Sequence, residues 1–320
     1  MVTPWHAKCG VASYSEKLSL ALSRLGVEVY IVKLHRTGVK DPDYMQFLAT
    51  RIPEHVDLIH VQHEYGLFSY CEEAFYAAAR ELGKPIVTTL HGGGGFQQDE
   101  EIARYSDVVV VHNRWQASRY GRPCVIIPHG VEPRQPLPKV EARRLLGVKA
   151  SYVAGCFGFI SPYKGLEDIL YAASKLRDVE FLIAGGWHLD HETRYMAELK
   201  RRSPQNVRWL GYLEEDQLPA FFGACDLIIH ASRFVSESGS LLTAIGYGKA
   251  VIARDLPPNR EKPVLDLFTT AEDLAEKVDY YVRTLDLCEA EQRARSYAEE
   301  NSWSRVAEKH EKLVYEKLLK

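Results

Sequence analysis

Short apolar runs alternate along the chain with longer stretches in which apolar residues recur at helical spacing. In the first half, the apolar and β-branched runs predict strands at 29–32, 58–61, 86–90, 108–111 and 125–127. The amphipathic stretches between them predict helices at 14–25, 71–82 and 115–120. Strands that alternate with helices in this way are typical of a parallel α/β sheet.

A proline-rich segment divides this pattern into two halves. Residues 133–138 hold three prolines and predict an extended linker. After it, strands are expected at 153–160, 181–184, 207–210, 227–230 and 251–253. Helices are expected at 166–176, 214–224, 241–247 and 272–285, with a last helical stretch from residue 303. The fold class is therefore α/β with two doubly wound parallel sheets, which bind ligands outside the carboxyl ends of their strands.

Length and composition narrow the function classes. A chain of 320 residues suggests two domains, and a net charge of −3 does not favour a nucleic-acid partner. No apolar run approaches the roughly 18 residues of a transmembrane segment, and residues 1–10 lack the apolar core of a signal peptide. The six cysteines are scattered without a C-x-x-C pair. We therefore expect a cytoplasmic protein without a cysteine-bound metal.

The segment after the strand at 227–230 is a candidate anion site. A polar loop leads to a helix that starts near Ser240. Backbone N–H groups of Ser238, Gly239 and Ser240 would point from the helix start to the strand ends, where they suit a phosphate or diphosphate. The alternative is an ordinary helix capped by serine.

Two further candidates follow other strands. Lys164, after the strand at 153–160, would neutralise a leaving phosphate, unless it is an ordinary surface lysine. His91 follows the strand at 86–90 and could bond a sugar hydroxyl or a phosphate, or could simply pack at the strand end. The glycines at 92–95 would serve a mobile loop or a close approach to a ligand. Histidines 60, 63 and 91 match no zinc pattern, and no metal is expected.

A series of motifs in a fixed order resembles a known family. These are CGVA at 9–12, LGVEV at 25–29, HVQHEYG at 60–66, TLHG at 89–92, IIPHGV at 126–131, the segment from Gly158 to Gly165, NVRWLGY at 206–212, ACD at 224–226, ESGS at 237–240 and GKAVI at 248–252. Over nearly its full length the chain is similar to the retaining GT-B glycosyltransferases of family 4, the glycosyl transferases group 1.

The resemblance implies a fold and a domain organisation. It implies two Rossmann-like domains that face each other across a cleft. Residues 1–135 would form the acceptor-side domain and 136–302 the donor domain, with the final helix at 303–320 packing back on the first.

The resemblance also implies roles for individual residues. The catalytic positions would be His91 on the transferred sugar, Lys164 on the diphosphate and Glu237 near the sugar hydroxyls. The residues around the donor, from its phosphate to its nucleobase, would be Gly10, Gly158, Tyr212, Leu213, Ser238, Gly239, Ser240 and Leu241. Enzymes of this family need neither a bound metal nor a cofactor.

The chain departs from the family pattern at two positions. Phe159 stands where the family has a phosphate-binding arginine. The family's second glutamate falls on Thr243 when aligned from Gly248, or on Ile245 when counted from Glu237. The first alignment also places the leading glutamate at Val235 rather than Glu237. Arg233 and Arg254 follow strands in the same region and are candidate substitutes for the missing arginine.

The function expected from this resemblance is transfer of a hexose from a UDP- or GDP-sugar to an acceptor hydroxyl of a carbohydrate or a lipid-linked molecule. Retention at the anomeric carbon and independence of metal are part of that expectation. The alternative is a nucleotide-sugar or carbohydrate-binding module of the same fold that has lost turnover, which the two departures favour. A sugar-nucleotide epimerase of the same two-domain shape fits the ordered motifs less well.

Overall fold

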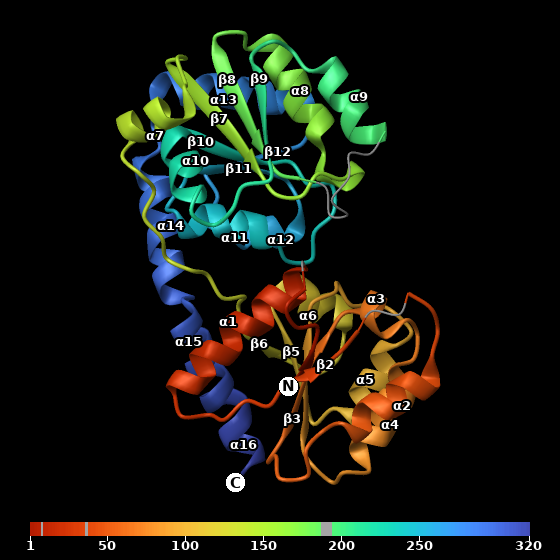
Figure 1. Cartoon of the computed structure of the whole chain (residues 1–320). Coiled ribbons are helices and arrows are strands. Elements are labelled where there is room, and N and C mark those ends of the chain that lie inside the picture. The colour runs from red at the N-terminus through yellow and green to blue at the C-terminus, as the bar shows by residue number, and fades with distance from the viewer. Residues whose placement is uncertain (8, 36–37, 187–193) are drawn as a thin grey trace. The chain divides into compact units, whose positions relative to one another are not determined.

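The structure is a computed structural model that describes residues 1–7, 9–35, 38–186 and 194–320. The chain divides into two units (Figure 1). The first consists of Met1–Gly130 with Asn301–Lys320, and the second of Val131–Glu300. Sequence analysis had placed these boundaries after residues 135 and 302.

The first unit is built on a six-stranded parallel sheet with the order β2-β1-β3-β4-β5-β6. Its strands are β1 (Val2–Thr3), β2 (Val32–Lys33), β3 (Ile59–His63), β4 (Ile86–Leu90), β5 (Val108–Val111) and β6 (Val125–Ile126). The strand order reverses between β1 and β3, which is the topological switch point of a doubly wound sheet.

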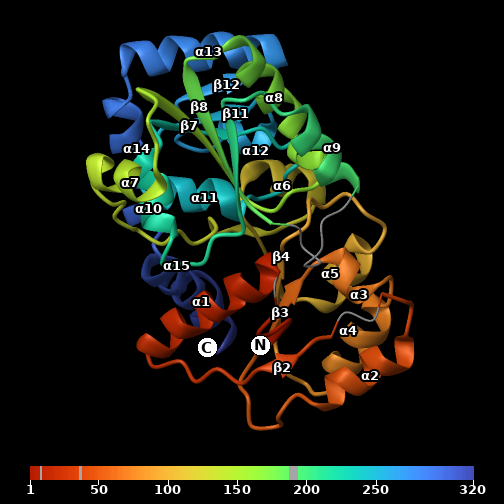
Figure 2. The same cartoon turned by 45° about the horizontal axis from the view of Figure 1, so that its top comes forward.

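Helices cover both faces of this sheet. They are α1 (Gly10–Arg24), α2 (Pro42–Thr50), α3 (Tyr65–Phe68), α4 (Glu72–Arg80), α5 (Asp99–Tyr105), α6 (Arg114–Tyr120), α15 (Trp303–His310) and α16 (Glu316–Leu318), with a π-helical turn at Glu311–Tyr315 before α16. Side chains of α1 and α15 share one core with Val87 and Val110 of the sheet. Helices α2, α4, α5 and α6 pack on the other face, where Ile59 and Val111 lie. The last helices thus complete the first unit (Figures 1 and 2).

The second unit has a parallel sheet with the order β12-β11-β10-β7-β8-β9. Its strands are β7 (Tyr152–Phe157), β8 (Val179–Ala184), β9 (Val207–Gly211), β10 (Leu227–His230), β11 (Val251–Arg254) and β12 (Asp266–Phe268). This is the Rossmann order, and its switch point lies between β7 and β10.

Two sets of helices sandwich the second sheet. The helices are α7 (Lys139–Leu146), α8 (Leu166–Lys175), α9 (Arg194–Arg202), α10 (Leu218–Ala224), α11 (Gly239–Gly246), α12 (Pro257–Arg260), α13 (Ala271–Thr284) and α14 (Cys288–Glu300). Helices α8, α9 and α13 pack around Phe181 on one face. Helices α7, α10, α11 and α14 pack around Leu182 on the other. Successive residues of β8 therefore point to opposite cores, as strands buried on both faces require.

Two of the predicted strands are wrong in their extent. Residues 29–31 are not part of a strand, because the short β1 pairs only with Val32 and Lys33. The strand expected at 153–160 ends at Phe157, since Gly158 leaves the extended conformation with φ at +132°. Among the helices, α10 begins at Leu218 rather than at 214.

The proline-rich segment is not a free linker. The backbone N–H of Arg134 donates to the carbonyl of Gly246 at 2.8 Å, and that of Leu137 donates to Pro219 at 2.9 Å. An added Cβ at Gly223 would lie 2.3 Å from the carbonyl oxygen of Leu137. The segment is therefore packed onto the second unit, and its prolines hold the extended conformation that this packing needs.

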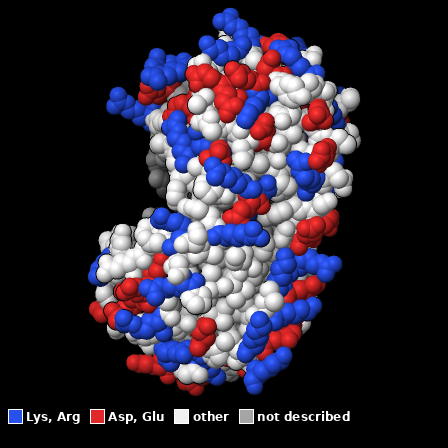
Figure 3. Space-filling model, turned by 180° about the vertical axis from the view of Figure 1, so that it is seen from behind, with Lys and Arg blue, Asp and Glu red and all other residues white. Residues whose placement is uncertain are grey.

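The charged side chains do not form a large surface patch of one sign on the face seen in Figure 3. Lysines and arginines are interspersed with acidic residues over the face in Figure 3, as the small net charge leads one to expect. Within the described residues, no helix combines the length and apolar character needed to cross a bilayer.

Candidate active site

The candidate site of the second unit lies at its topological switch point. β7 and β10 are neighbours in the sheet, but the chain leaves them in opposite directions. After β7 it enters a 3₁₀ turn at Pro162–Lys164 and then α8, and after β10 it enters α11. Ligands of such sheets bind outside these strand ends. The predicted residues Lys164, Gly158 and Glu237 all lie in the two connections.

Glycines allow three segments to meet at this point. A Cβ on Gly185, just after β8, would lie 1.9 Å from the carbonyl oxygen of Gly158. A Cβ on Gly158 would lie 3.1 Å from the Cβ of Ser240 at the start of α11. The structure therefore brings the predicted residues Gly158 and Ser240 together. Sequence analysis missed Gly185, although a Gly-Gly pair directly after a strand was a readable signal.

The first turn of α11 presents amide groups at the same place. Ser238 caps the helix, and its hydroxyl accepts from the N–H of Leu241 at 3.3 Å. The N–H of Ser238 donates to the carboxylate of Glu237 at 3.2 Å. Among the described residues, no hydrogen-bond acceptor faces the N–H groups of Gly239 and Ser240. Two of the three predicted amides, those of Gly239 and Ser240, are thus available at the positive end of the helix dipole.

Lys164 brings a cation to the strand ends. Its ammonium lies 5.0 Å from the ring centre of Tyr163 and forms no ion pair with any described residue. Burial, together with the smaller effect of the charge of Lys164, lowers the pKa of His230 to about 3. Glu237 acts on His230 in the opposite direction, which places Lys164 and Glu237 near the end of β10. His230 is a neutral residue of the site to which sequence analysis gave no role.

Gly165 fixes the position of Lys164. It adopts φ +67°, and an added Cβ would lie 2.2 Å from the carbonyl oxygen of Ala231. We expect Gly165→Ala to lower the free energy of unfolding by more than the 1–2 kcal/mol, roughly, that left-handed backbone strain costs. Gly211→Ala is the matched control, because Gly211 has φ +73° and open space at its Cβ position. Urea unfolding of both variants measures the difference, and equal losses would contradict the predicted clash.

Glu237 forms a buried ion pair that sequence analysis did not predict. Its carboxylate lies 2.8 Å from the ammonium of Lys262, and the two side chains are 5% and 3% exposed. Tyr297 contributes its hydroxyl at 3.4 Å from the same ammonium. Burial alone would lower the pKa of Lys262, but the charge of Glu237 outweighs it and raises the pKa. Glu237 therefore compensates a buried charge, whatever else it contacts.

The two candidate substitute arginines already have partners. Arg254 forms an ion pair with Asp168 and donates to the carbonyl of Ala231 at 3.1 Å. Arg233 lies 3.2 Å from Glu167 and is half exposed. The role of either arginine at a phosphate stays a prediction, and Arg233 has the more accessible side chain.

The two departures from the family pattern have local explanations. Phe159 stacks loosely on Tyr212, with ring centres 6.4 Å apart. The Thr243 hydroxyl donates to the carbonyl of Gly239 one helical turn earlier, at 2.8 Å. Tyr212 is 54% exposed, whereas Leu213 packs against the core beneath α10 and α11. Phe159 and Tyr212 together form an aromatic surface after β7 and β9.

In the first unit, histidines gather at the carboxyl ends of the strands. His91 follows β4, and its ring lies 2.9 Å from the Gln62 amide oxygen and 3.3 Å from the His112 ring nitrogen. Burial, with further contributions from His112 and other histidines, holds the pKa of His91 well below its usual value. His91 is therefore neutral. Its contact with a transferred sugar stays a prediction.

The glycines after His91 allow the backbone of this loop to pack closely against other segments of the first unit. Added Cβ atoms on Gly92 and Gly94 would lie 2.5 Å from the ring of Tyr65 and 2.9 Å from the backbone nitrogen of Tyr120. Asp99 accepts from the backbone N–H of Gly95 at 2.7 Å. The loop is thus held in place by α3, α5 and α6. Gly10, by contrast, is exposed at the start of α1 with open space at its Cβ position, as the predicted approach of a phosphate would require.

The buried histidines make stability depend on pH. Burial lowers the pKa of His310 to about 4, and His60 and His91 are lowered as well. The unfolded chain binds these protons at higher pH than the folded chain, so stability is full above pH 6.5 and falls as the pH drops. His310 alone should cost about 2 kcal/mol between pH 7 and pH 5. Urea unfolding at the two pH values measures this loss.

The control for this prediction removes a titrating group. His310→Gln should reduce the loss of stability between pH 7 and pH 5, whereas substitution of the exposed His35 by Gln should leave it unchanged. If both variants lose as much stability as the parent chain, His310 does not stay neutral in the fold.

The described residues contain no group of three histidine, cysteine or acidic side chains arranged to hold a metal ion. Lys164 and the amides of α11 bring positive charge to the candidate site.

Comparison with known proteins identifies the second unit. Residues 151–284 match the family Glycosyl transferases group 1. The second unit is therefore similar to the glycosyltransferases of this family. The matched residues include β7, β10 and α11, and therefore every candidate residue of the second unit. No curated protein matches the sequence significantly.

Solved structures show the fold of the whole chain. HepE from Anabaena, in complex with UDP and glucose, has 18% identity and a TM-score of 0.77, with 98% of each chain covered. A glycosyltransferase from Rickettsia africae has 18% identity and a TM-score of 0.81, covering 100% of this chain and 97% of its own. Sucrose-phosphate synthase from Thermosynechococcus elongatus has 16% identity and a TM-score of 0.76, covering 99% and 95%. The expected two-domain GT-B fold is confirmed.

Proposed function

We propose that this protein is a retaining glycosyltransferase of family 4 that transfers a hexose from a nucleotide-diphosphate sugar to an acceptor hydroxyl. The observation that carries the proposal is the pairing of Lys164 with the available amides of Gly239 and Ser240 at one switch point. A cation without an ionic partner and a helix start are the two features that a leaving diphosphate needs.

In this mechanism, most of the rate enhancement comes from electrostatic stabilisation of the leaving diphosphate. Lys164 and the start of α11 stabilise the negative charge that develops on the diphosphate as the glycosidic bond breaks. His91 is neutral and adds no charge, and because its two ring nitrogens already contact Gln62 and His112, a hydrogen bond to the transferred sugar replaces one of these contacts. Because protein groups carry the positive charge, the reaction needs no metal. Activity should then persist when EDTA is present.

The donor tested first is UDP-glucose. HepE has been solved with UDP, with UDP and glucose, and with UDP-glucose. The exposed ring of Tyr212 next to Phe159 offers an apolar surface for a nucleobase. The acceptor is a carbohydrate or lipid-linked hydroxyl. The six unpaired cysteines suit the reducing cytoplasm, which is the compartment we propose.

Released nucleotide measures the proposed reaction. UDP-glucose, other UDP-hexoses and GDP-hexoses are incubated with the protein and a panel of saccharide and lipid-linked acceptors, and free UDP or GDP is quantified. Release that depends on acceptor, with retained configuration in the product by NMR, supports the proposal. If no nucleotide or nucleotide sugar raises the melting temperature, the donor site is wrong.

The second candidate function is donor binding without turnover. Phe159 and Thr243 remove two groups with which the family holds its donor, and each lost charge-assisted hydrogen bond costs roughly 1.5–3 kcal/mol. A thermal shift with UDP-sugars but no release with any acceptor would favour this binding module over the enzyme.

A further inference from the structure

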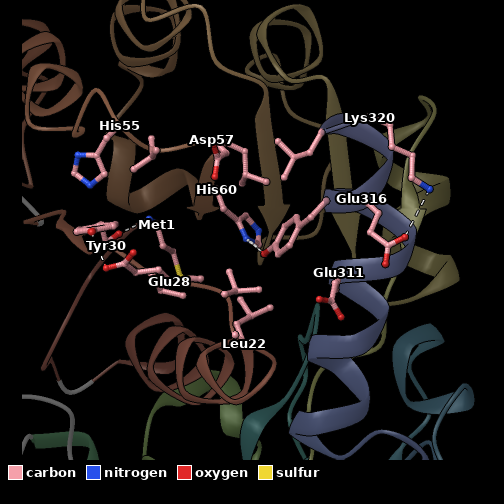
Figure 4. Close-up of a pocket in the computed structure, with 17 residues that line it drawn as sticks. Met1, Leu22, Glu28, Tyr30, His55, Asp57, His60, Glu311, Glu316 and Lys320 are labelled. Carbon is pink, nitrogen blue, oxygen red and sulfur yellow. Dashed lines mark hydrogen bonds and ion pairs between the residues drawn. The ribbon is translucent and has the colours of Figure 1, made fainter.

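A half-exposed phenylalanine stands in the loop after β4, at the carboxyl edge of the first sheet. Phe96 is 49% exposed and comes five residues after His91, the predicted contact of the transferred sugar. The cavity in Figure 4, of about 630 Å³, lies at the opposite edge, because its lining includes the segments that precede β2 and β3. A ligand on Phe96 would therefore lie at the edge of the sheet that also carries His91 and Gly10.

The phenyl ring is held in its exposed position by several contacts. It packs on the ring of Tyr65 with 4.3 Å between the ring centres. Tyr65 in turn lies on Gly92, where an added Cβ would be 2.5 Å from the tyrosine ring. The carboxylate of Asp99, only 4% exposed, accepts from the backbone N–H groups of Gly95 at 2.7 Å and Phe96 at 3.1 Å. It also accepts from the hydroxyl of Tyr65. The exposure of Phe96 is therefore a fixed feature of the loop.

Hydrogen-bonding side chains neighbour the ring. Glu64 precedes the stacked tyrosine in the chain, and Gln97 follows Phe96. Throughout the part of the chain that the structure describes, neither side chain has a hydrogen-bond or ionic partner. The exposed Arg119 lies beside Gly95, with its Nη2 2.9 Å from the position of an added Cβ. A carboxylate, an amide and a guanidinium together accept and donate hydrogen bonds, as the hydroxyl groups of a ligand require.

The size of this apolar surface favours one class of ligand. A single exposed apolar side chain is ordinary on a protein surface, but here hydrogen-bonding groups border a fixed aromatic face. A pyranose ring is similar in size to a phenyl ring, with C–H groups on its face and hydroxyls around its rim, so it matches both features. A lipid chain needs a longer apolar surface, and Gly95 and Gln97, which are exposed on either side of Phe96, do not extend it.

We propose that Phe96 is an acceptor subsite, on which a sugar ring of a saccharide acceptor stacks with its C–H face while its hydroxyls bond Glu64 and Gln97. The inference rests on the glycosyl transfer proposed above and names its acceptor class, a saccharide recognised by its ring rather than by a lipid chain. Because the phenyl ring is held in place before a ligand arrives, the subsite binds saccharide in the absence of the donor.

Saturation-transfer NMR tests the subsite with defined probes. Methyl glycosides of glucose, galactose, mannose and N-acetylglucosamine are titrated into the full chain without a donor. At least one should bind, with the strongest transfer from aromatic protons to the C–H groups of one face of its ring. Phe96→Ala should weaken this binding by roughly 5- to 10-fold, and Phe96→Trp should restore it. Phe47→Ala is the matched control, because Phe47 is 58% exposed on α2 of the same unit, and it should bind as the parent does.

The proposal is overturned if none of the glycosides binds, or if Phe96→Ala binds them as tightly as the parent chain. Dodecyl phosphate is the probe for a lipid acceptor. Binding of dodecyl phosphate that Phe96→Ala abolishes would identify a lipid chain as the occupant and would also overturn the proposal.

Failure of this subsite can be told apart from failure of the donor site. UDP should raise the melting temperature of Phe96→Ala as much as that of the parent, since Phe96 belongs to the acceptor. A UDP shift without glycoside binding removes the subsite and leaves the proposed transfer standing, whereas glycoside binding without a UDP shift does the reverse. In the transfer assay, Phe96→Ala should raise KM for a saccharide acceptor and leave KM for the nucleotide sugar unchanged. A rise in KM for the nucleotide sugar alone would contradict the assignment.

Discussion

Lys164→Gln should lower the rate of sugar transfer by roughly 100- to 1,000-fold, the effect of removing one preorganised group that stabilises a transition-state charge. The loss should fall mainly on kcat, because the charge on the leaving diphosphate grows as the glycosidic bond breaks. Released UDP at saturating UDP-sugar measures it. The fold should be unaffected, since Lys164 forms no ion pair with any described residue.

Lys149→Gln is the control, because Lys149 is an exposed lysine of the same unit and its substitution changes the net charge equally. It should keep the parent rate. Unchanged turnover in Lys164→Gln, with an unchanged melting temperature, would remove Lys164 from the diphosphate site. If the protein is a binding module, the same variant should instead weaken binding of UDP and leave no rate to measure.

The elements that the sequence predicted best are strands that are buried on both faces of a sheet. Ile86–Leu90 and Leu227–His230 are buried on both faces, and their apolar and β-branched runs match the observed strands closely. β1 was missed because two residues carry no periodicity. Residues 29–31 have the pattern of a strand but are not paired with β1, which contacts only Val32 and Lys33. A segment forms a strand only where a neighbouring strand pairs with it, and the local sequence pattern does not show whether such a neighbour exists.

Several helices were missed although their local signals were present. α2 begins with Asp41 as its cap and Pro42 in its first turn, which is a readable start. α14 buries only alanines, at positions 290, 294 and 298, so its apolar stripe is narrow. α2 has only nine residues and α14 only small buried side chains, so the apolar periodicity of each is weak, and both helices are held by packing against other elements.

Sequence analysis identified the loops that form the candidate site, but not which of their residues contact one another. The rule that ligands bind after parallel strands led to Gly158, Lys164 and the start of α11 without knowledge of the strand order. The contact between Gly158 and Ser240 and the ion pair between Glu237 and Lys262 join residues that are 82 and 25 positions apart. Such pairs depend on how the sheet is assembled. No spacing rule along the chain contains them.

Glu237→Ala should be among the most destabilising substitutions of an acidic residue in this chain. It leaves the ammonium of Lys262 buried without its counter-charge, which costs roughly 3–5 kcal/mol. The double variant Glu237→Met with Lys262→Met should recover most of this loss, because an apolar pair of similar volume needs no charge compensation. Urea unfolding measures the stability of both variants, with Glu276→Ala at an exposed position as a control that should change it little.

The double variant also separates two roles of Glu237. If the carboxylate only holds Lys262, the stable double variant keeps its transfer rate. If it also orients the donor sugar, as the resemblance implies, the variant folds but transfers slowly. A Glu237→Ala variant as stable as the parent would contradict the ion pair itself.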